Sequence, residues 1–196
     1  MGEGRRRASG DVPQVAIRLA PAPARIAAIL DPRPIALSDA GRQIVDESWD
    51  EQLRLGRRHR RGEIFSIVDV SRGDGALVIR MGSSDYAHYI ATILGLLPTA
   101  EAARVVFTSV VPTTSDGRLV LGKMNGHTAS PGRVQPAGGG IERCDLADGT
   151  FDLVGCALRE LREELAVDGT DLEDPCGQPS SARTIAASSG CCSRPG

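Results

Sequence analysis

The sequence predicts a mixed α/β fold. Strand-like apolar runs alternate along the chain with segments that carry helix-capping residues and helical apolar spacing. Hydrophobic residues make up 41% of the 196 residues, which is enough for a core, although only 3% are aromatic. A chain of this length holds one domain of ordinary size, or one and a half.

The first predicted elements lie before residue 58. A short strand is expected within residues 12–21 and a brief helix from Ala24 to Leu30. Ser38 is a suitable N-cap for a longer helix that runs to about Arg57. The apolar face of that helix would contain Ile44, Val45, Trp49, Leu53 and Leu55.

A hairpin and a second helix are expected next. Residues 64–70 (IFSIVDV) and 76–82 (ALVIRMG) have strand composition, and the SRGDG segment between them is typical of a turn. Ser83 or Ser84 would cap a helix that continues to Leu97 and stops at Pro98. We therefore predict a flexible arm at residues 1–10 and an N-terminal α+β region at residues 11–102.

The next segment contains two predicted strands and a helix. Residues 104–111 and 118–124 are strand-like and are joined by the turn segment TTSDG. A charged helix is expected at about residues 152–166, with Asp152 as its N-cap.

Four charged residues in this last helix follow a glycine-rich segment, GGGIE (138–142). They are Arg159, Glu160, Glu163 and Glu164. Glutamates spaced i, i+3 and i+4 share one helix face, where like charges repel unless a cation lies between them. A hard divalent ion with oxygen ligands, Mg²⁺ or Mn²⁺, fits such a face. A solvated helix face with i,i+4 ion pairs is the other interpretation of these residues alone.

These residues resemble the Nudix box, the signature G-x5-E-x7-R-E-U-x-E-E-x-G-U of hydrolases that cleave nucleoside diphosphate derivatives (U is a bulky aliphatic residue). Gly139 would align with the first glycine, and residues 159–167 with the second half of the box. The resemblance implies a Nudix-type α/β/α sandwich, preceded by the α+β region, in residues 103–168.

The resemblance also implies roles for individual residues. Glu160, Glu163 and Glu164, with Gly139, would bind the metal, and Arg159, Glu160 and Glu163 would be catalytic. Gly138, Gly139, Gly140 and Arg133 would bind the substrate. Such an ion neutralises phosphate oxygens and makes water a stronger nucleophile near neutral pH.

Three features depart from the family pattern. The interval from Gly139 to Arg159 is six residues longer, so the first glutamate of the box corresponds to Asp145 or to Phe151, depending on the end from which one counts. We expect the extra residues, CDLADG, to form a loop bulge. Ala166 replaces a helix-ending glycine, and Gly169 could act as a later cap. Residues 169–196 lack strand or helix patterning, so we predict a disordered tail and a fold that is incomplete at its C-terminal end.

Net charge, apolar runs and cysteine spacing indicate which partners the protein binds and in which compartment it resides. The formal net charge of −2 argues against nonspecific nucleic-acid binding as the main role. The longest apolar run is too short to cross a bilayer, and the five cysteines show no metal-ligand spacing. We expect a cytoplasmic protein with a nucleotide-type small-molecule substrate, and a second copy of the chain could complete an open sheet edge as a homodimer. The alternatives are a Nudix-like protein that binds a nucleotide or a partner without catalysis, and a truncated product.

Overall fold

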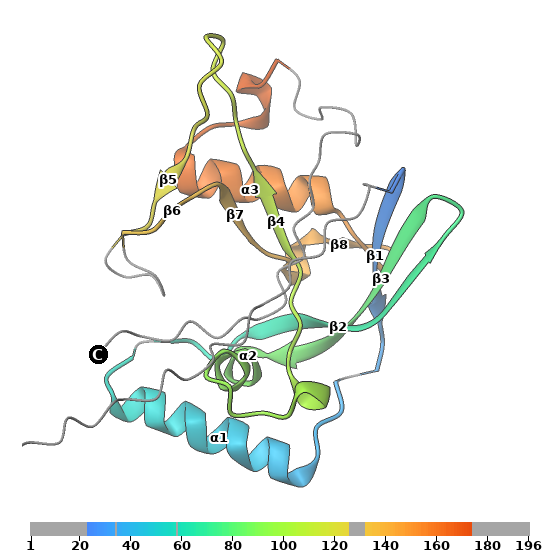
Figure 1. Cartoon of the computed structure of the whole chain (residues 1–196), viewed down its shortest axis with the longest axis vertical. Coiled ribbons are helices and arrows are strands. Elements are labelled where there is room, and N and C mark those ends of the chain that lie inside the picture. Colours follow the sequence, from blue (N-terminus) through green and yellow to red (C-terminus); the bar gives the residue numbers. More distant parts are fainter. Residues whose placement is uncertain (1–22, 34, 58, 126–131, 174–196) are drawn as a thin grey trace, which may run out of the picture.

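Five strands pair into one mixed sheet in the computed structural model, which describes residues 23–33, 35–57, 59–125 and 132–173 (Figure 1). They are β1 (Arg25–Asp31), β2 (Glu63–Gly73), β3 (Ala76–Asp85), β8 (Leu146–Ala147) and β9 (Thr150–Phe151). Their order across the sheet is β2-β3-β1-β9-β8. The mixed α/β prediction is confirmed at this level. The flexible arm and the strand within residues 12–21 lie outside the described residues.

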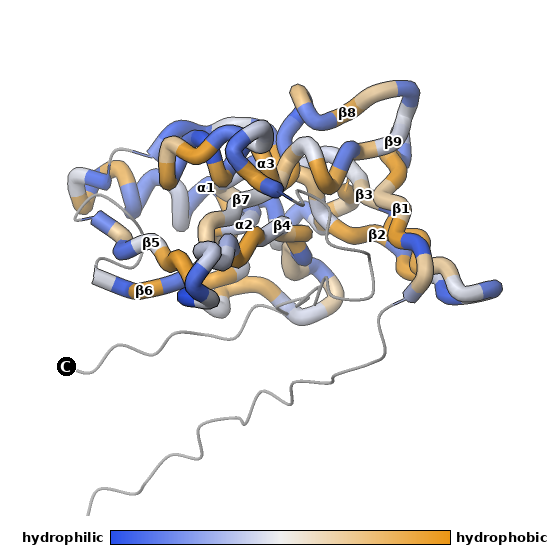
Figure 2. The backbone as a smooth tube through the Cα atoms, turned by 90° about the horizontal axis from the view of Figure 1, so that it is seen from above, coloured by the Kyte–Doolittle hydropathy of each residue, from blue (hydrophilic) through white to orange (hydrophobic). Residues whose placement is uncertain are grey.

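β1 lies in the middle of the sheet, where a brief helix was predicted. It runs parallel to β3 from the Arg25–Ala76 pair to the Asp31–Gly82 pair, and antiparallel to β9 on its other side. Local helix propensity, which the alanines of this segment raise, is overridden by pairing on both edges. Figure 2 shows apolar residues along β1 and β2, as expected for strands that line a core.

The predicted hairpin is confirmed as β2 and β3. Its strands are longer than predicted, and the turn contains Asp74 and Gly75, which have φ values of 49° and 73°. Positive φ is available to Gly without strain and is tolerated by Asp, which explains the DG pair at this position.

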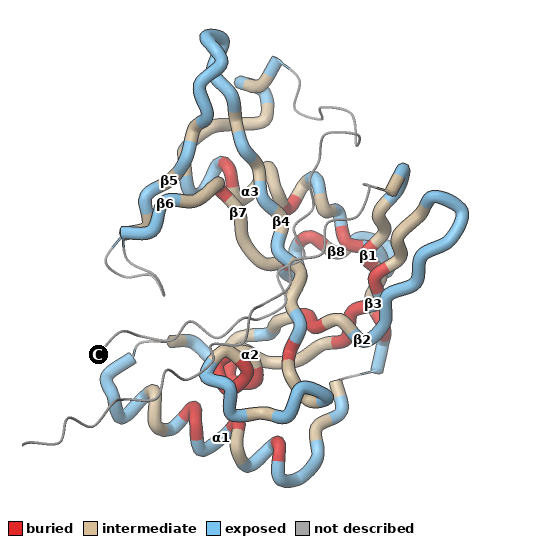
Figure 3. The backbone as a smooth tube through the Cα atoms, in the orientation of Figure 1, coloured by how far each residue is buried: buried red, intermediate tan, exposed pale blue. Residues whose placement is uncertain are grey.

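Two helices, α1 (Asp39–Arg54) and α2 (Tyr86–Ile93), pack against each other beside the sheet. Ser38 caps α1 as predicted, and its hydroxyl accepts from the Gly41 N–H at 3.0 Å. Val45 and Trp49 pack with Ala87, Ile90 and Ala91 of α2 in a second apolar cluster, and buried residues line α2 in Figure 3. Leu53 and Leu55, predicted on the apolar face of α1, are exposed.

The N-cap predicted for α2 was wrong. β3 continues through Ser83 and Ser84, which pair with Phe65 and Ile64, so the helix begins only after Asp85. The Asp85 carboxylate accepts from the His88 N–H at 2.9 Å. The helix also ends at Ile93, before the predicted Leu97.

A third helix, α3 (Leu153–Leu165), lies against a separate two-stranded ribbon of β4 (Phe107–Val110) and β7 (Ala137–Gly140) (Figure 1). A second short ribbon pairs β5 (Gly122–Lys123) with β6 (Val134–Gln135). The strands predicted at 104–111 and 118–124 therefore form over shorter ranges. They do not pair with each other as regular strands, because β7 is the partner of β4.

The segment predicted as a loop bulge forms a small hairpin of β8 and β9. Its turn residues, Asp148 and Gly149, have φ values of 48° and 78°, the left-handed pair that favours Asp-Gly in two-residue hairpins. Because β9 pairs with β1, the hairpin joins the helix α3 segment to the N-terminal sheet.

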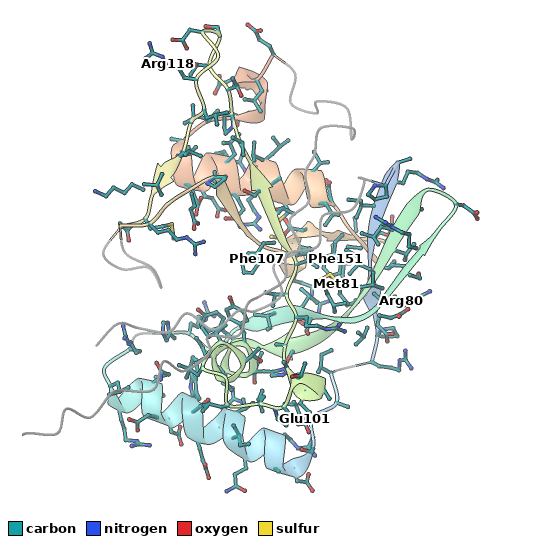
Figure 4. The ribbon with its side chains drawn as sticks, in the orientation of Figure 1. Arg80, Met81, Glu101, Phe107, Arg118 and Phe151 are labelled. Carbon is teal, nitrogen blue, oxygen red and sulfur yellow. The ribbon has the colours of Figure 1, made fainter. Side chains whose placement is uncertain are left out.

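One core crosses the predicted boundary between residues 102 and 103. Phe65 and Met81 from the N-terminal sheet pack in the same cluster as Ile141, Phe151 and Cys156. Figure 4 shows Met81 and Phe151 close together between the sheet and α3. The two predicted regions therefore share their largest apolar cluster.

Both ends of α3 are defined by capping residues. Asp152 is the N-cap as predicted, and its carboxylate accepts from the Gly155 N–H at 2.8 Å. At the other end Ala166 adopts the left-handed conformation, with φ 54° and ψ 30°. The alternative cap at Gly169 was wrong, because Gly169–Asp171 form a separate 3-10 helix, η3, capped by Asp168. Those first residues of the predicted disordered tail are thus ordered, and residues 174–196 lie outside the described residues.

The left-handed Ala166 predicts a stabilising substitution. Ala166→Gly should raise the free energy of unfolding by up to about 1 kcal/mol, because glycine adopts this conformation without the steric cost of a Cβ. Ala157→Gly, inside the same helix, should lower it by about 1 kcal/mol. Denaturant unfolding of both variants checks the pair. A loss of stability in Ala166→Gly would contradict the observed helix end.

No helix within the described ranges is long and apolar enough to cross a membrane.

Candidate functional site

Arg159 is the centre of a charged network on the face of α3 that meets β7. Its Nε and Nη2 donate to Oδ1 and Oδ2 of Asp145 at 3.2 and 3.0 Å, a two-pronged arrangement that fixes the plane of the guanidinium. The Arg159 side chain is 15% exposed and that of Asp145 only 5%. Nη1 donates to Glu160 at 2.8 Å and to Glu163 at 3.4 Å.

Asp145 and Phe151, the two residues that the sequence left open for the first glutamate of the box, lie in different surroundings. Asp145 ends the 3-10 helix η2 (Arg143–Asp145), and its carboxylate faces Arg159. Phe151 is buried in the core, with its ring 4.7 Å from the Phe65 ring in an edge-to-face arrangement. Of these two residues, only Asp145 pairs with Arg159.

The predicted glycine loop is a strand, and two glutamates lie against it. A Cβ built on Gly139 would fall 2.4 Å from the carboxylate atoms of Glu160, so this side chain lies directly over the glycine and would have to move for a larger residue. The Gly138 N–H donates to Oε2 of Glu164 at 3.0 Å. Gly138 is itself restricted, because a Cβ there would lie 2.3 Å from the Thr108 carbonyl oxygen on β4.

The three glutamates differ in exposure. Glu160 is 12% exposed, between Arg159 and Gly139, whereas Glu163 is 57% exposed. Glu164 is exposed but is held by its bond to Gly138. The structure thus brings Arg159, the three glutamates and the three glycines of β7 to one place.

Arg133 lies apart from this group. It is exposed at the start of β6, and its carbonyl oxygen accepts from the Met124 N–H at 2.8 Å. Within the described residues its guanidinium forms no ion pair with the glutamates.

Burial and pairing shift the pKa values of the site in opposite directions. Burial raises the pKa of Asp145, but hydrogen bonds from Arg159 and from the Glu142 N–H outweigh it, so the net pKa lies below the usual value. Hydrogen bonds that Arg159 donates to Asp145 raise the pKa of Arg159. Burial raises the pKa of Glu160, and repulsion from Glu163 and Glu164 adds to it, despite Arg159.

Cys156 is a member of the site that the sequence did not indicate. Its fully buried Sγ is 3.1 Å from Thr108 Oγ1, 3.6 Å from Arg159 Nη2 and 3.7 Å from the Gly140 carbonyl oxygen. Burial raises the pKa of this thiol to about 11, so it is neutral at physiological pH. Its position three residues before Arg159 was the one available signal, because i and i+3 lie on the same helix face.

The described residues contain no group of three His, Cys, Asp or Glu side chains arranged to hold a metal ion. Side chains need not supply the whole set, since Mg²⁺ usually binds one or two carboxylates together with waters and substrate phosphates. Two carboxylates of α3 lie beside β7, that of Glu160 over Gly139 and that of Glu164 on the Gly138 N–H, and this arrangement is compatible with an ion of this kind.

A cavity of about 370 Å³ adjoins the site between α3 and η3. Arg159 and Arg162 line it, together with Gly155, Leu158, Asp168, Gly169 and Thr170. Arg162 lies 3.8 Å from the Asp168 carboxylate and is largely exposed.

No protein-family model matches the chain, and a search of curated proteins finds no match to it.

Proposed function

We propose that this protein is a Nudix-type hydrolase, which uses Mg²⁺ or Mn²⁺ to cleave the pyrophosphate of a nucleoside diphosphate derivative. The observation that carries the proposal is the contact of Glu160 and Glu164 with Gly139 and Gly138, beside an arginine that Asp145 holds in place. On a solvated helix face these side chains would point away from the neighbouring strand. Here Glu160 lies over Gly139, and Glu164 accepts from the Gly138 N–H.

Glu160, Glu163 and Glu164 would hold the ion, and the backbone of Gly139 lies next to them. When bound, the ion would neutralise phosphate charge and favour deprotonation of the attacking water. Burial, and to a lesser extent repulsion from Glu163 and Glu164, raises the pKa of Glu160, and a divalent cation would oppose this shift.

Arg159 would act by orientation. Asp145 fixes its guanidinium in one plane, and Nη1 is directed toward Glu160 and Glu163. An arginine held in this way positions two carboxylates, which serves a general base better than two freely rotating side chains. The products would be a nucleoside monophosphate and the phosphorylated second group.

Hydrolysis of a panel of nucleotides tests the proposal. ADP-ribose, UDP-glucose and dinucleoside polyphosphates would be incubated with the full chain in Mg²⁺, in Mn²⁺ and in chelator. We expect nucleoside monophosphate to form from at least one substrate, with turnover lost in chelator and restored by added metal. Absence of turnover with every substrate and both metals would contradict the enzymatic proposal.

A nucleotide-binding protein without catalysis is the second candidate. Glu160 and Glu163 both pair with Arg159, which favours this candidate. The guanidinium then supplies the positive charge beside these carboxylates that a metal ion would otherwise supply. Calorimetric titration with the same nucleotides separates the two candidates. Binding without product release supports this second function.

A further inference from the structure

The 3-10 helix η2 lies between the N-terminal sheet and α3, and its two charged ends pair in opposite directions. Arg143 at its start pairs with Glu63 of β2, and Asp145 at its end pairs with Arg159 of α3. These are the only two described residues of η2 that form ion pairs, and they are separated by a single residue. η2 therefore connects β2 to α3 through two ion pairs that are one residue apart.

Arg143 contacts the N-terminal sheet through two hydrogen bonds and through an aromatic ring. Its Nε donates to Glu63 Oε2 at 3.0 Å and its Nη2 to Oε1 at 2.5 Å. The guanidinium carbon also lies 5.0 Å from the centre of the Phe65 ring, within range of a cation–π interaction. Glu63 is fixed from its other side by the Ser83 hydroxyl, which donates at 2.7 Å. Arg143 holds the pKa of Glu63 below its usual value.

A second connection reaches α3 through the aromatic pair. Phe65 packs edge-to-face on Phe151, which directly precedes the helix N-cap Asp152. The Asp152 N–H donates to the Asp145 carbonyl oxygen at 2.8 Å. The start of α3 and the carboxylate that holds Arg159 are thus fixed to the same patch of the N-terminal sheet.

We propose that Arg143 and Glu63 are positioning residues for the proposed catalytic site, through which the N-terminal sheet sets the place of Asp145 and hence of Arg159. This inference rests on the proposed function and assigns a role to the N-terminal region, which holds one side of η2 in place. Within the described residues neither side chain forms a hydrogen bond or ion pair with Glu160, Glu163 or Glu164, so their effect on hydrolysis passes through Asp145.

If Arg143 and Glu63 had a purely structural role, their substitution would change stability and not turnover alone. The Arg143 and Glu63 side chains are 54% and 34% exposed, and exposed ion pairs contribute little to stability. Loss of the pair should therefore leave the melting temperature nearly unchanged. Misplacement of a catalytic group by less than about 1 Å, in contrast, can lower turnover many-fold.

Charge exchange in the full chain tests the proposal. Arg143→Glu and Glu63→Arg should each lower kcat for the best nucleotide substrate by about fivefold to tenfold, with KM changed less than about twofold. The exchanged double variant should recover kcat to within about twofold of the parent. Arg143→Gln and Glu63→Gln provide milder versions should a reversed charge prevent folding. Arg61→Gln, which breaks ion pairs to Asp46 and Asp85 beside α1 and α2, is the matched control and should leave kcat unchanged.

Two results would overturn the proposal: folded single variants with parental kcat, or a folded double variant no more active than the singles. If the parent hydrolyses none of the nucleotides, the proposed function itself fails, and the coupling is then measured by NMR on the Arg159 Nε–H resonance. A shift of that resonance in Arg143→Gln, reversed in the exchanged double variant, supports the coupling. An unchanged resonance in folded Arg143→Gln rejects it.

Discussion

Glu164→Gln is expected to lower metal-dependent hydrolysis by about a hundredfold or more while leaving the fold intact. The Gln side-chain oxygen can still accept from the Gly138 N–H, now at 3.0 Å from Glu164 Oε2, so the contact with β7 is kept and only the charge is lost. Glu163→Gln should behave similarly, because Glu163 is 57% exposed and its loss leaves no buried group without a partner. Steady-state hydrolysis and circular dichroism measure the two properties.

The matched control for these substitutions is Glu47→Gln. Glu47 is an exposed glutamate on α1, where it accepts from Gln43 at 2.7 Å, and it lies outside the charged network of α3. Its substitution removes the same charge and should leave turnover unchanged. Equal turnover in Glu164→Gln, Glu163→Gln and the parent would remove the basis for metal binding by these carboxylates.

Substitution of Glu160 should abolish hydrolysis without lowering the melting temperature. Its pKa is raised in the folded protein, first by burial. A group with a raised folded pKa contributes stability below its unfolded pKa, and this contribution is lost as the pH rises through the folded value. Glu160→Gln stays neutral, so in metal-free buffer at pH 7 its melting temperature should equal or exceed that of the parent, although hydrolysis is lost. A drop of several degrees would contradict this sign.

Asp145→Asn should be the most destabilising substitution in the site, lowering the free energy of unfolding by about 3 kcal/mol. Asp145 and Arg159 are both largely buried, and removal of the carboxylate leaves the guanidinium with weaker partners. Urea unfolding at pH 7 gives the size of the loss. A value within about 0.5 kcal/mol of the parent, as for a surface substitution, would contradict the buried pair.

The same pair predicts an acid-sensitive contribution to stability. The net pKa of Asp145 lies below its usual value, so its contribution is present above the unfolded pKa and is lost as the pH falls through the folded value. Asp145→Asn should therefore flatten the acid side of the stability profile. The double variant Asp145→Leu/Arg159→Met should recover much of the stability, since apolar pairs can replace buried ion pairs, but none of the hydrolysis.

The sequence correctly predicted helix caps, a hairpin turn and helix bounds, because these features depend on residues that are neighbours in the chain. Ser38 and Asp152 cap their helices as predicted, because a side-chain oxygen at this position accepts from a free N–H group of the first helical turn. The DG pair at residues 74–75 likewise marked its hairpin. The helix that carries the four charged residues was predicted within about one residue at each end.

Contacts between distant segments could not be predicted in the same way. β1 is a strand because β3 and β9 pair with both its edges, and neither partner is adjacent in sequence. The sequence left Asp145 and Phe151 as two candidates for the first glutamate of the box. In the structure Asp145 lies against Arg159, whereas Phe151 is buried in the core. The GGG segment was predicted as a loop, but it forms part of the strand β7, and the Glu160 carboxylate lies directly over Gly139.

Anomalous diffraction from crystals soaked in Mn²⁺ and a non-hydrolysable nucleoside diphosphate derivative tests the central claim most directly. We predict a manganese peak within about 2.5 Å of carboxylate oxygens from the Glu160, Glu163 and Glu164 group, beside Gly139. Crystals in which the nucleotide is bound but no peak lies there, with Glu160 still paired to Arg159 and Glu164 to Gly138, would contradict it.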